Sequence, residues 1–337
     1  MQGNADDQQP AGAGAGRCRL VMGSTGGNMS LAILCSGQGG QHARMFELTG
    51  DAPEAAGIFA HAEALLGWDA RTWVLTASED ALHENRYAQL LCTLQALSVA
   101  AVLAQSLPTK RCVAGYSVGE VAAWSVTGLI KPEDALDLIV ARADAMDAAR
   151  RGEQGMLFVR GLSRTVIEHM TERADAAVAI VNPGDAYVIA GMQSALMEIA
   201  AEAQRRGAAR VVPVAVKVAA HTRLMADATP LFRDRLSLVH IKPVLPAGTR
   251  LLSGIDGETV LNIPEGADKL AQQISHPVQW AACLQACVEA GVTVFLELGP
   301  GRALADMAAG AFPGIAARSV DEFKSFHGVR AWLDRVL

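Results

Sequence analysis

The sequence predicts an α/β protein: a large domain built on a parallel sheet, with a smaller subdomain inserted into it. Short apolar runs at 31–35, 111–114 and 293–298 alternate with helical patterns, which is typical of parallel strands connected by helices. Between 153 and 217 the pattern changes to short strands and helices in the order βαββαβ. With 337 residues, 51% of them hydrophobic, the chain can bury a sizeable core.

Charge and composition exclude several classes of partner. A formal net charge of −6 and the lack of a lysine- or arginine-rich face argue against nucleic acid. No apolar run reaches the roughly 18 residues of a membrane span, and no secretory signal opens the chain. We therefore expect a cytoplasmic protein with no membrane partner. The cysteines lack the paired spacing of zinc sites and disulfide frameworks, which predicts reduced, mostly buried thiols and no metal site. They are Cys18, Cys35, Cys92, Cys112, Cys283 and Cys287.

The most informative stretch is Gly115-Tyr116-Ser117-Val118-Gly119, which follows an apolar run and precedes a helical pattern. A strand that turns sharply into a helix needs these two glycines, because a Cβ there would clash with the neighbouring backbone. The Ser117 hydroxyl is then exposed, and the Val118 amide points at any oxyanion that develops beside it. Ser117 is therefore a candidate nucleophile for acyl transfer. The alternative is a glycine-flanked serine in an ordinary turn.

A glycine-rich segment, 36–41, follows the first strand. Consecutive glycines let a backbone approach a ligand closely and present its N–H groups. No Gly-Lys-Ser/Thr follows, so the segment is a poor match to a phosphate-binding loop. An oxyanion or substrate loop and a plain turn both remain open.

Arg142 lies on a predicted helix, 135–149, among apolar residues. Earlier in the chain, 52–107 has a helical pattern, within which 85–103 predicts one long buried helix. An arginine in an apolar setting either extends its charged end to the surface or clamps a carboxylate with two hydrogen bonds. Both interpretations of Arg142 remain open.

The inserted subdomain, 153–217, predicts a ferredoxin-like fold from its βαββαβ order. Asn182-Pro183-Gly184-Asp185, between two β-rich runs, predicts a hairpin within it. The flanking segments, 29–152 and 218–337, form the large domain, for which the strand, serine turn and helix predict an α/β-hydrolase-like fold. Residues 1–28 are rich in Gly and Ala without periodicity and are interpreted as a disordered leader.

His221 is one of eight histidines, and it follows a strand pattern and opens a helical one. A lone histidine is more often structural than catalytic. Spacing alone therefore leaves the role of His221 open.

Together these motifs resemble the malonyl-CoA:acyl carrier protein transacylase family, which is related to polyketide synthase acyltransferase domains and malonate decarboxylase malonyltransferase subunits. The resemblance covers about residues 31–325. It rests on several motifs in the right order, which are Gly37-Gln38-Gly39-Gly40-Gln41, Gly115-Tyr116-Ser117-Val118-Gly119-Glu120, Arg142, His221, Gln273 ahead of Pro277-Val278-Gln279-Trp280, and Leu298-Gly299-Pro300-Gly301.

The resemblance implies roles for five residues in acyl transfer. Ser117 is the acylated nucleophile and His221 its general base and then general acid. Gln38 and Val118 supply oxyanion-hole N–H groups. Gln273 orients the histidine, whose imidazole in this family is hydrogen-bonded to a backbone carbonyl rather than to an aspartate.

The resemblance also implies the substrates. Arg142 holds the free carboxylate of a malonyl group, which a fixed guanidinium can select because an unpaired buried charge is costly. The acyl group passes from a CoA thioester to Ser117 and then to the phosphopantetheine thiol of an acyl carrier protein, with no bound cofactor.

Three single positions and one four-residue segment depart from the family pattern. Tyr116 stands where histidine is usual, Ser36 where proline is usual, and His276 where asparagine is usual. Val218-Ala219-Ala220-His221 matches neither signature that separates malonyl from methylmalonyl selectivity, and its small side chains leave room for an α-branch.

Two other functions remain open. A serine hydrolase or thioesterase would use the same nucleophile, although α/β-hydrolases place their histidine near the chain end, unlike His221. A non-catalytic assembly subunit is the other alternative. For a carrier protein's acidic surface, the basic pairs Arg150-Arg151 and Arg205-Arg206 are candidate contacts, and solvated charge is the alternative for each.

Overall fold

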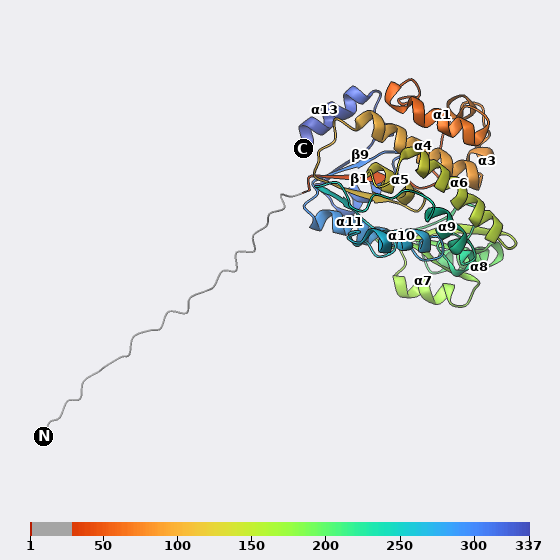
Figure 1. Ribbon diagram of the computed structural model, residues 1–337. Coiled ribbons are helices and arrows are strands. Elements are labelled where there is room, and N and C mark those ends of the chain that lie inside the picture. Colours follow the sequence, from red (N-terminus) through yellow and green to blue (C-terminus); the bar gives the residue numbers. More distant parts are fainter. Residues whose placement is uncertain (2–28) are drawn as a thin grey trace.

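The computed structural model describes Met1 and residues 29–337, which fold around two β-sheets (Figure 1). The predicted leader, apart from Met1, and Cys18 lie outside the described residues. Within them the fold is α/β, with one parallel and one antiparallel sheet.

The larger sheet is parallel, with strand order β7-β2-β1-β8-β9. Its central strands are mostly apolar and buried because helices cover both faces. Since parallel strands end at the same edge, the segments that follow β1, β2 and β8 meet there. The strands are β1 (Leu31–Cys35), β2 (Arg111–Gly115), β7 (Thr249–Leu251), β8 (Val294–Glu297) and β9 (Ala316–Ser319).

Helices pack on both sides of this sheet: in Figure 1, α4 and α13 lie on one side and α11 on the other. The stretch 52–107, predicted to be helical, contains η1, α1, α2, α3 and α4. The helices are η1 (Pro53–Ala55), α1 (Ala56–Leu66), α2 (Ala70–Trp73), α3 (Glu79–Leu82), α4 (Asn85–Leu103), α5 (Gly119–Val126), α6 (Pro132–Ala149), η2 (Arg223–Met225), α9 (Ala228–Leu236), α10 (Ile263–Gln272), α11 (Trp280–Glu289), α12 (Ala303–Ala311), η3 (Val320–Glu322) and α13 (Phe326–Val336).

The predicted long helix 85–103 is confirmed as α4. By length and composition α4 could cross a membrane, so the expectation that no run was long and apolar enough was wrong. However, 78% of its most apolar window is buried inside the protein. Contact with α6 and α5 explains its apolar composition, as expected for a core helix.

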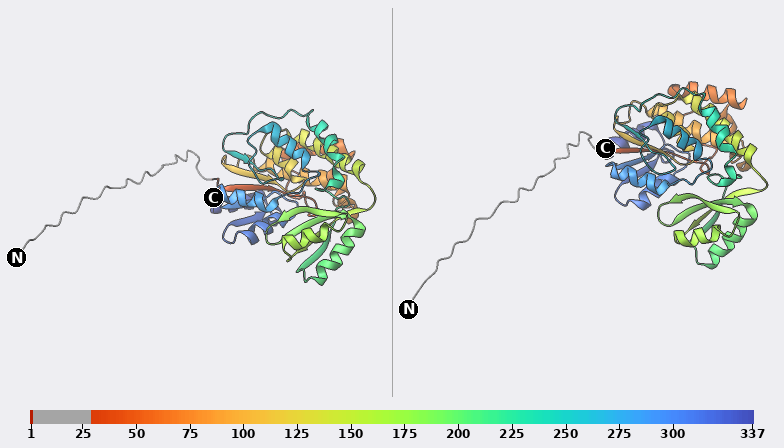
Figure 2. Two further views of the ribbon diagram at one scale, coloured as in Figure 1. Left: turned by 90° about the horizontal axis from the view of Figure 1, so that it is seen from below. Right: turned by 60° about the horizontal axis from the view of Figure 1, so that its bottom comes forward.

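The smaller sheet is antiparallel, with strand order β4-β5-β3-β6. The predicted element order βαββαβ is confirmed. Figure 2 shows this unit, in green, beside the parallel sheet. Its elements are β3 (Gln154–Arg160), α7 (Arg164–Thr171), β4 (Ala176–Asn182), β5 (Ala186–Met192), α8 (Gln193–Arg205) and β6 (Arg210–Val214).

Alternation along the strands divides the core of this smaller unit. Leu157 and Ile189 pack with residues of α7 and α8 in a separate cluster. Met156 and Val188 point to the other face and join the core of the large sheet. Because side chains alternate along a strand, each strand contributes to both cores.

Backbone hydrogen bonds attach the smaller sheet to the segment before α11. The Val181 N–H donates to the Val278 carbonyl at 2.9 Å, and the Val278 N–H donates to the Ala179 carbonyl at 2.9 Å. This pairing fixes the smaller sheet beside the segment that connects α10, which ends next to Gln273, to α11.

Candidate active site

Ser117 occupies the turn between β2 and α5 with a φ of 56°. The flanking glycines are required by close approach. A Cβ at Gly115 would lie 2.2 Å from the Glu120 nitrogen, and one at Gly119 would lie 2.1 Å from the Cys35 oxygen. The sharp turn predicted from these glycines is confirmed, and it leaves Ser117 partly exposed.

His221 lies against this serine. Its Nε2 is 2.7 Å from the Ser117 hydroxyl oxygen, and its Nδ1 is 2.6 Å from the Gln273 carbonyl oxygen. A carbonyl can only accept a hydrogen bond, so Nδ1 carries the proton and Nε2 is free to accept the serine proton. Burial, assisted by the Arg142 charge, lowers the pKa of His221 to about 3. The imidazole is therefore neutral at pH 7.

The local prediction for His221 was partly wrong. β6 ends at Val214, well before the histidine, and only the short turn η2 follows it. His221 has a φ of 64°, and its N–H donates to the Ile274 carbonyl at 2.8 Å. Contacts to a distant segment, rather than a helix start, therefore fix its position.

Arg142 is 1% exposed, so the interpretation that it extends to the surface was wrong. Its Nη1 donates to Gln89 Oε1 at 2.6 Å and to Met146 Sδ at 3.3 Å, and its Nη2 donates to Gln273 Oε1 at 3.3 Å. These bonds use three of its five N–H donors. Burial lowers the pKa of Arg142 to about 10, so the group stays charged at pH 7.

The side chain of Gln273 connects these groups. Its Nε2 donates to the Ser117 carbonyl at 3.1 Å and to Glu120 Oε2 at 2.6 Å. Its Oε1 faces Arg142, and its main-chain carbonyl accepts from His221. The sequence analysis assigned catalytic or substrate-binding roles to Ser117, Arg142, His221 and Gln273. All four belong to one hydrogen-bond network.

The two predicted oxyanion groups lie on adjacent segments. A Cβ at Gly37 would lie 2.8 Å from the Tyr116 ring, so the segment holding Gln38 packs on the residue before Ser117. Within residues 29–337, neither the Gln38 nor the Val118 backbone N–H donates to a protein acceptor. The side-chain nitrogen of Gln38 is also buried without a partner there.

Sequence reasoning missed Glu120 and Gln89. Glu120 is 1% exposed and accepts from Gln273 and from the Gly254 N–H, the latter at 3.1 Å. The available signal was an ionisable residue at the start of an otherwise apolar helix. Gln89 carried no such signal, because a glutamine on a long helix is ordinary.

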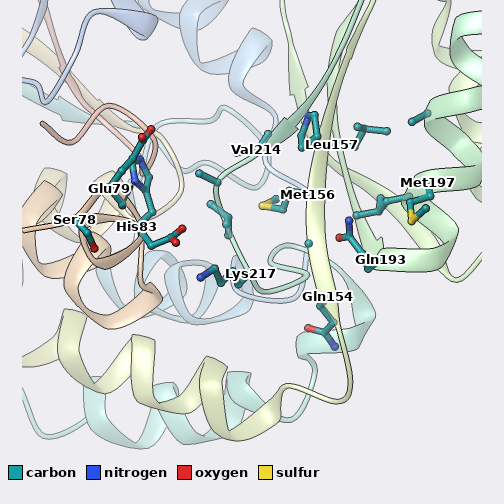
Figure 3. Close-up of a pocket in the computed structure, with 17 residues that line it drawn as sticks. Ser78, Glu79, His83, Gln154, Met156, Leu157, Gln193, Met197, Val214 and Lys217 are labelled. Atoms are coloured by element: carbon teal, nitrogen blue, oxygen red, sulfur yellow. Dashed lines mark hydrogen bonds between the residues drawn. The ribbon is translucent and has the colours of Figure 1, made fainter.

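Other features lie apart from this network. A cavity of about 550 Å³ lies between Ser78–His83 and the smaller sheet, and neither Ser117, Arg142 nor His221 lines it. Its lining residues are drawn in Figure 3. Gln154, at its edge, accepts from the Ala219 N–H at 3.1 Å. In the part of the chain that the structure describes, no three His, Cys, Asp or Glu side chains are grouped to hold a metal.

The predicted basic pairs lie partly in ion pairs. Arg205 and Arg206 both bond Glu202, each at 2.6 Å, and Arg151 lies 3.6 Å from Asp227. This arrangement favours the solvated-charge interpretation, since surface pairs of this kind contribute little.

Comparison with known proteins identifies the family. Residues 33–315 match the acyl transferase domain family. The chain belongs to this family. The matched region covers most of the described residues and includes every residue of the network around Ser117.

Individual relatives agree. The chain is 31% identical over 299 residues to the malonyl CoA-acyl carrier protein transacylase of Mycobacterium tuberculosis, covering 86% of this chain and 96% of that protein. It is 32% identical over 296 residues to polyketide synthase GfsB of Streptomyces halstedii, covering 86% of this chain but 5% of that protein. A solved acyl-carrier-protein S-malonyltransferase from Burkholderia pseudomallei superposes with a TM-score of 0.82 at 27% identity, covering 90% of this chain and all of that one (100%).

Proposed function

We propose that this acyl transferase moves a malonyl group from CoA to the phosphopantetheine thiol of an acyl carrier protein, through a Ser117 ester. The observation that carries the proposal is the 2.7 Å contact between Ser117 and a neutral His221 within the network that contains Arg142. The names of the malonyl-transferring relatives, 31% and 27% identical, support the choice of acyl group and acceptor.

In the first half-reaction, His221 Nε2 takes the proton of the Ser117 hydroxyl while its oxygen attacks the thioester carbonyl. The amides of Gln38 and Val118 donate to the oxyanion of the tetrahedral intermediate. When the intermediate collapses, the carbon–sulfur bond breaks and His221 gives its proton to the CoA sulfur. The products are free CoA and a malonyl ester on Ser117.

In the second half-reaction the same groups act in reverse order. His221 takes the proton of the phosphopantetheine thiol, and the thiolate attacks the ester carbonyl. The Ser117 oxygen leaves and regains the proton from His221. Throughout, the Gln273 carbonyl holds Nδ1–H, which keeps Nε2 available.

Arg142 supplies the preference for a free carboxylate. Its guanidinium is buried and charged, and two of its five N–H donors are not used by the bonds to Gln89, Met146 and Gln273. A carboxylate placed beside the Arg142 guanidinium forms a charge-assisted hydrogen-bonded pair with it. An acetyl group has no carboxylate, so the buried Arg142 charge then lacks a partner of opposite charge.

We also propose the predicted division of the chain: an α/β-hydrolase-like domain of 29–152 and 218–337, and a ferredoxin-like subdomain of 153–217. The parallel order β7-β2-β1-β8-β9 and the antiparallel order β4-β5-β3-β6 support it. A cytoplasmic location, without membrane or nucleic-acid partners, belongs to the same proposal.

The test is brief exposure to malonyl-CoA followed by intact-protein mass spectrometry. We expect one malonyl adduct, its loss in Ser117→Ala and its retention in Ser125→Ala, a buried serine of α5 outside the network. Addition of carrier protein bearing phosphopantetheine should transfer the adduct. An adduct that persists in Ser117→Ala contradicts the assigned nucleophile, and continued CoA release beyond one equivalent per protein without any acceptor favours the hydrolase alternative.

A further inference from the structure

Glu120 is a buried carboxylate in contact with the network around Ser117. One of its oxygens, Oε2, accepts from Gln273 Nε2 at 2.6 Å and from the Gly254 N–H at 3.1 Å. A Cβ at Gly254 would lie 2.5 Å from that oxygen, so a glycine is needed for the carboxylate to approach. The fold therefore makes room for a charge in this place.

The neighbours of Gln273 determine which way its amide points. On one side lies Arg142, which can only donate hydrogen bonds, and on the other lies Glu120, which when ionised can only accept them. Oε1 must therefore face Arg142, and Nε2 must face Glu120. In this orientation Nε2 also reaches the Ser117 carbonyl at 3.1 Å.

We propose that Glu120 is a positioning residue for acyl transfer. As a carboxylate it fixes the Gln273 side chain, and through Gln273 it holds Arg142, the Ser117 turn and His221 in one arrangement. The inference rests on the proposed function, because it assigns a task within that reaction.

The surroundings of Glu120 make its protonation state sensitive to pH near neutrality. Burial raises the pKa of Glu120 to about 7, against the bonds from Gln273 and Gly254 and the charge of Arg142. Asp256, which is itself paired with Lys269 at 2.9 Å, adds a negative charge near Glu120. Burial, together with the charges of Glu120 and Asp256, raises the pKa of the Cys283 thiol, so this neighbour stays neutral. Protonated Glu120 can donate, so it no longer selects one orientation of Gln273.

The experiment measures the single-turnover rate of Ser117 acylation by malonyl-CoA between pH 5 and pH 9. In the unmodified protein we expect this rate to rise with pH through the region near 7, since His221, with a pKa of about 3, titrates below this range. In Glu120→Gln the rise should be absent and the rate at pH 8 about 10-fold to 100-fold lower, because the charge-assisted bond to Gln273 Nε2 is lost and only Arg142 and the Ser117 carbonyl still orient the Gln273 amide.

Glu297→Gln is the matched control. Glu297 is also fully buried, and burial raises its pKa to about 7, but it bonds Ser36 and Ala305 rather than Gln273. This variant should keep the rise in rate with pH. A rise that is lost in both variants, or kept in Glu120→Gln, would overturn the role of Glu120.

A second variant covers the case in which Glu120→Gln does not fold. Glu120→Asp keeps an acceptor-only carboxylate, so it should keep a pH-dependent rise with a lowered maximum rate. A flat profile in folded Glu120→Asp would overturn the proposal. If the unmodified protein forms no malonyl adduct, the proposed function and this inference both fail, whereas a normal adduct with an unchanged profile in Glu120→Gln removes only the inference.

Discussion

Two strand-to-helix turns at the same edge of the parallel sheet each have a buried glutamate beside them, Glu120 in α5 and Glu297 in β8, and the two glutamates bond different partners. At the end of β8, Glu297 Oε2 accepts from the Ala305 N–H at 2.8 Å, at the start of α12, and Glu297 Oε1 accepts from Ser36 at 2.7 Å. After β2, Glu120 turns sideways to Gln273, and the Val118 N–H before α5 donates to no acceptor among residues 29–337.

We call the turn after β8 the closed turn, because a carboxylate of the protein bonds the helix start that follows it. We call the turn after β2 the open turn, because the Val118 N–H at its helix start has no acceptor among residues 29–337. A helix start carries unpaired N–H groups and a partial positive charge, and either the protein or a ligand must satisfy them. At α12 the Glu297 carboxylate does so, whereas at α5 an oxyanion can. Burial raises the pKa of Glu120 and Glu297 alike, so burial does not distinguish their roles, and hydrogen-bond partners do.

Removing the histidine should affect only the open turn. His221→Ala should lower the rate of Ser117 acylation by about 10³-fold, because no other group accepts the serine proton. His42→Ala, which removes a partner of Asp321 beside the closed turn, should leave this rate close to that of the unmodified protein. Rapid-quench assays with malonyl-CoA measure both rates, and similar losses in the two variants would contradict the distinction.

Glycine substitutions compare the helices after the two turns. In Gly119→Ala of α5 the new Cβ would lie 2.1 Å from the Cys35 oxygen, so we expect a loss of about 3 kcal/mol in the free energy of unfolding. Gly310→Ala in α12 meets nothing within 4 Å and should raise that energy by up to about 1 kcal/mol. Urea unfolding measures both. Equal stability of the two variants would show that the sharp turn is not sterically required.

The proposed carboxylate preference depends on Arg142 of α6, which is connected to the open turn through Gln273. Arg142→Ala should lower malonyl transfer by about 10²-fold, because the substrate charge then has no partner, and lower acetyl transfer much less. Transfer rates with malonyl-CoA and acetyl-CoA measure the ratio. Equal losses for the two substrates would mean that Arg142 only supports the structure.

The smallest effect concerns the closed turn and pH. Because the pKa of Glu297 is raised on folding, the folded protein holds this proton to higher pH than the unfolded chain does. This contribution to stability is present at low pH and is lost as the pH rises through about 7. When the pH is raised from 5 to 8, the free energy of unfolding of Glu297→Gln should therefore increase by about 2 kcal/mol relative to that of the unmodified protein. Urea unfolding at both values tests this, and a constant difference would contradict it.

Local patterns in the chain were sufficient for the element order and the serine turn. The limits of α4, the βαββαβ order and the need for glycine at positions 115 and 119 follow from periodicity and from sterics within a few residues. The resemblance to a family, rather than spacing, directed attention to His221, Arg142 and Gln273. Nothing local indicated the left-handed backbone of His221, which depends on bonds to Gln273 and Ile274.

The sequence determined where the chain turns and which apolar faces are buried, because those depend on neighbouring residues. Packing of distant segments determined the charge arrangement: Glu120, Arg142 and Gln273 come from α5, α6 and the end of α10, and their contacts exist only after those helices assemble. The burial of Arg142 and the direction of the Gln273 amide are therefore tertiary properties. So is the fact that Glu120, and not Glu297, bonds Gln273. Their physical cause is that hydrogen-bond partners far apart in sequence must satisfy each other inside a core that excludes water.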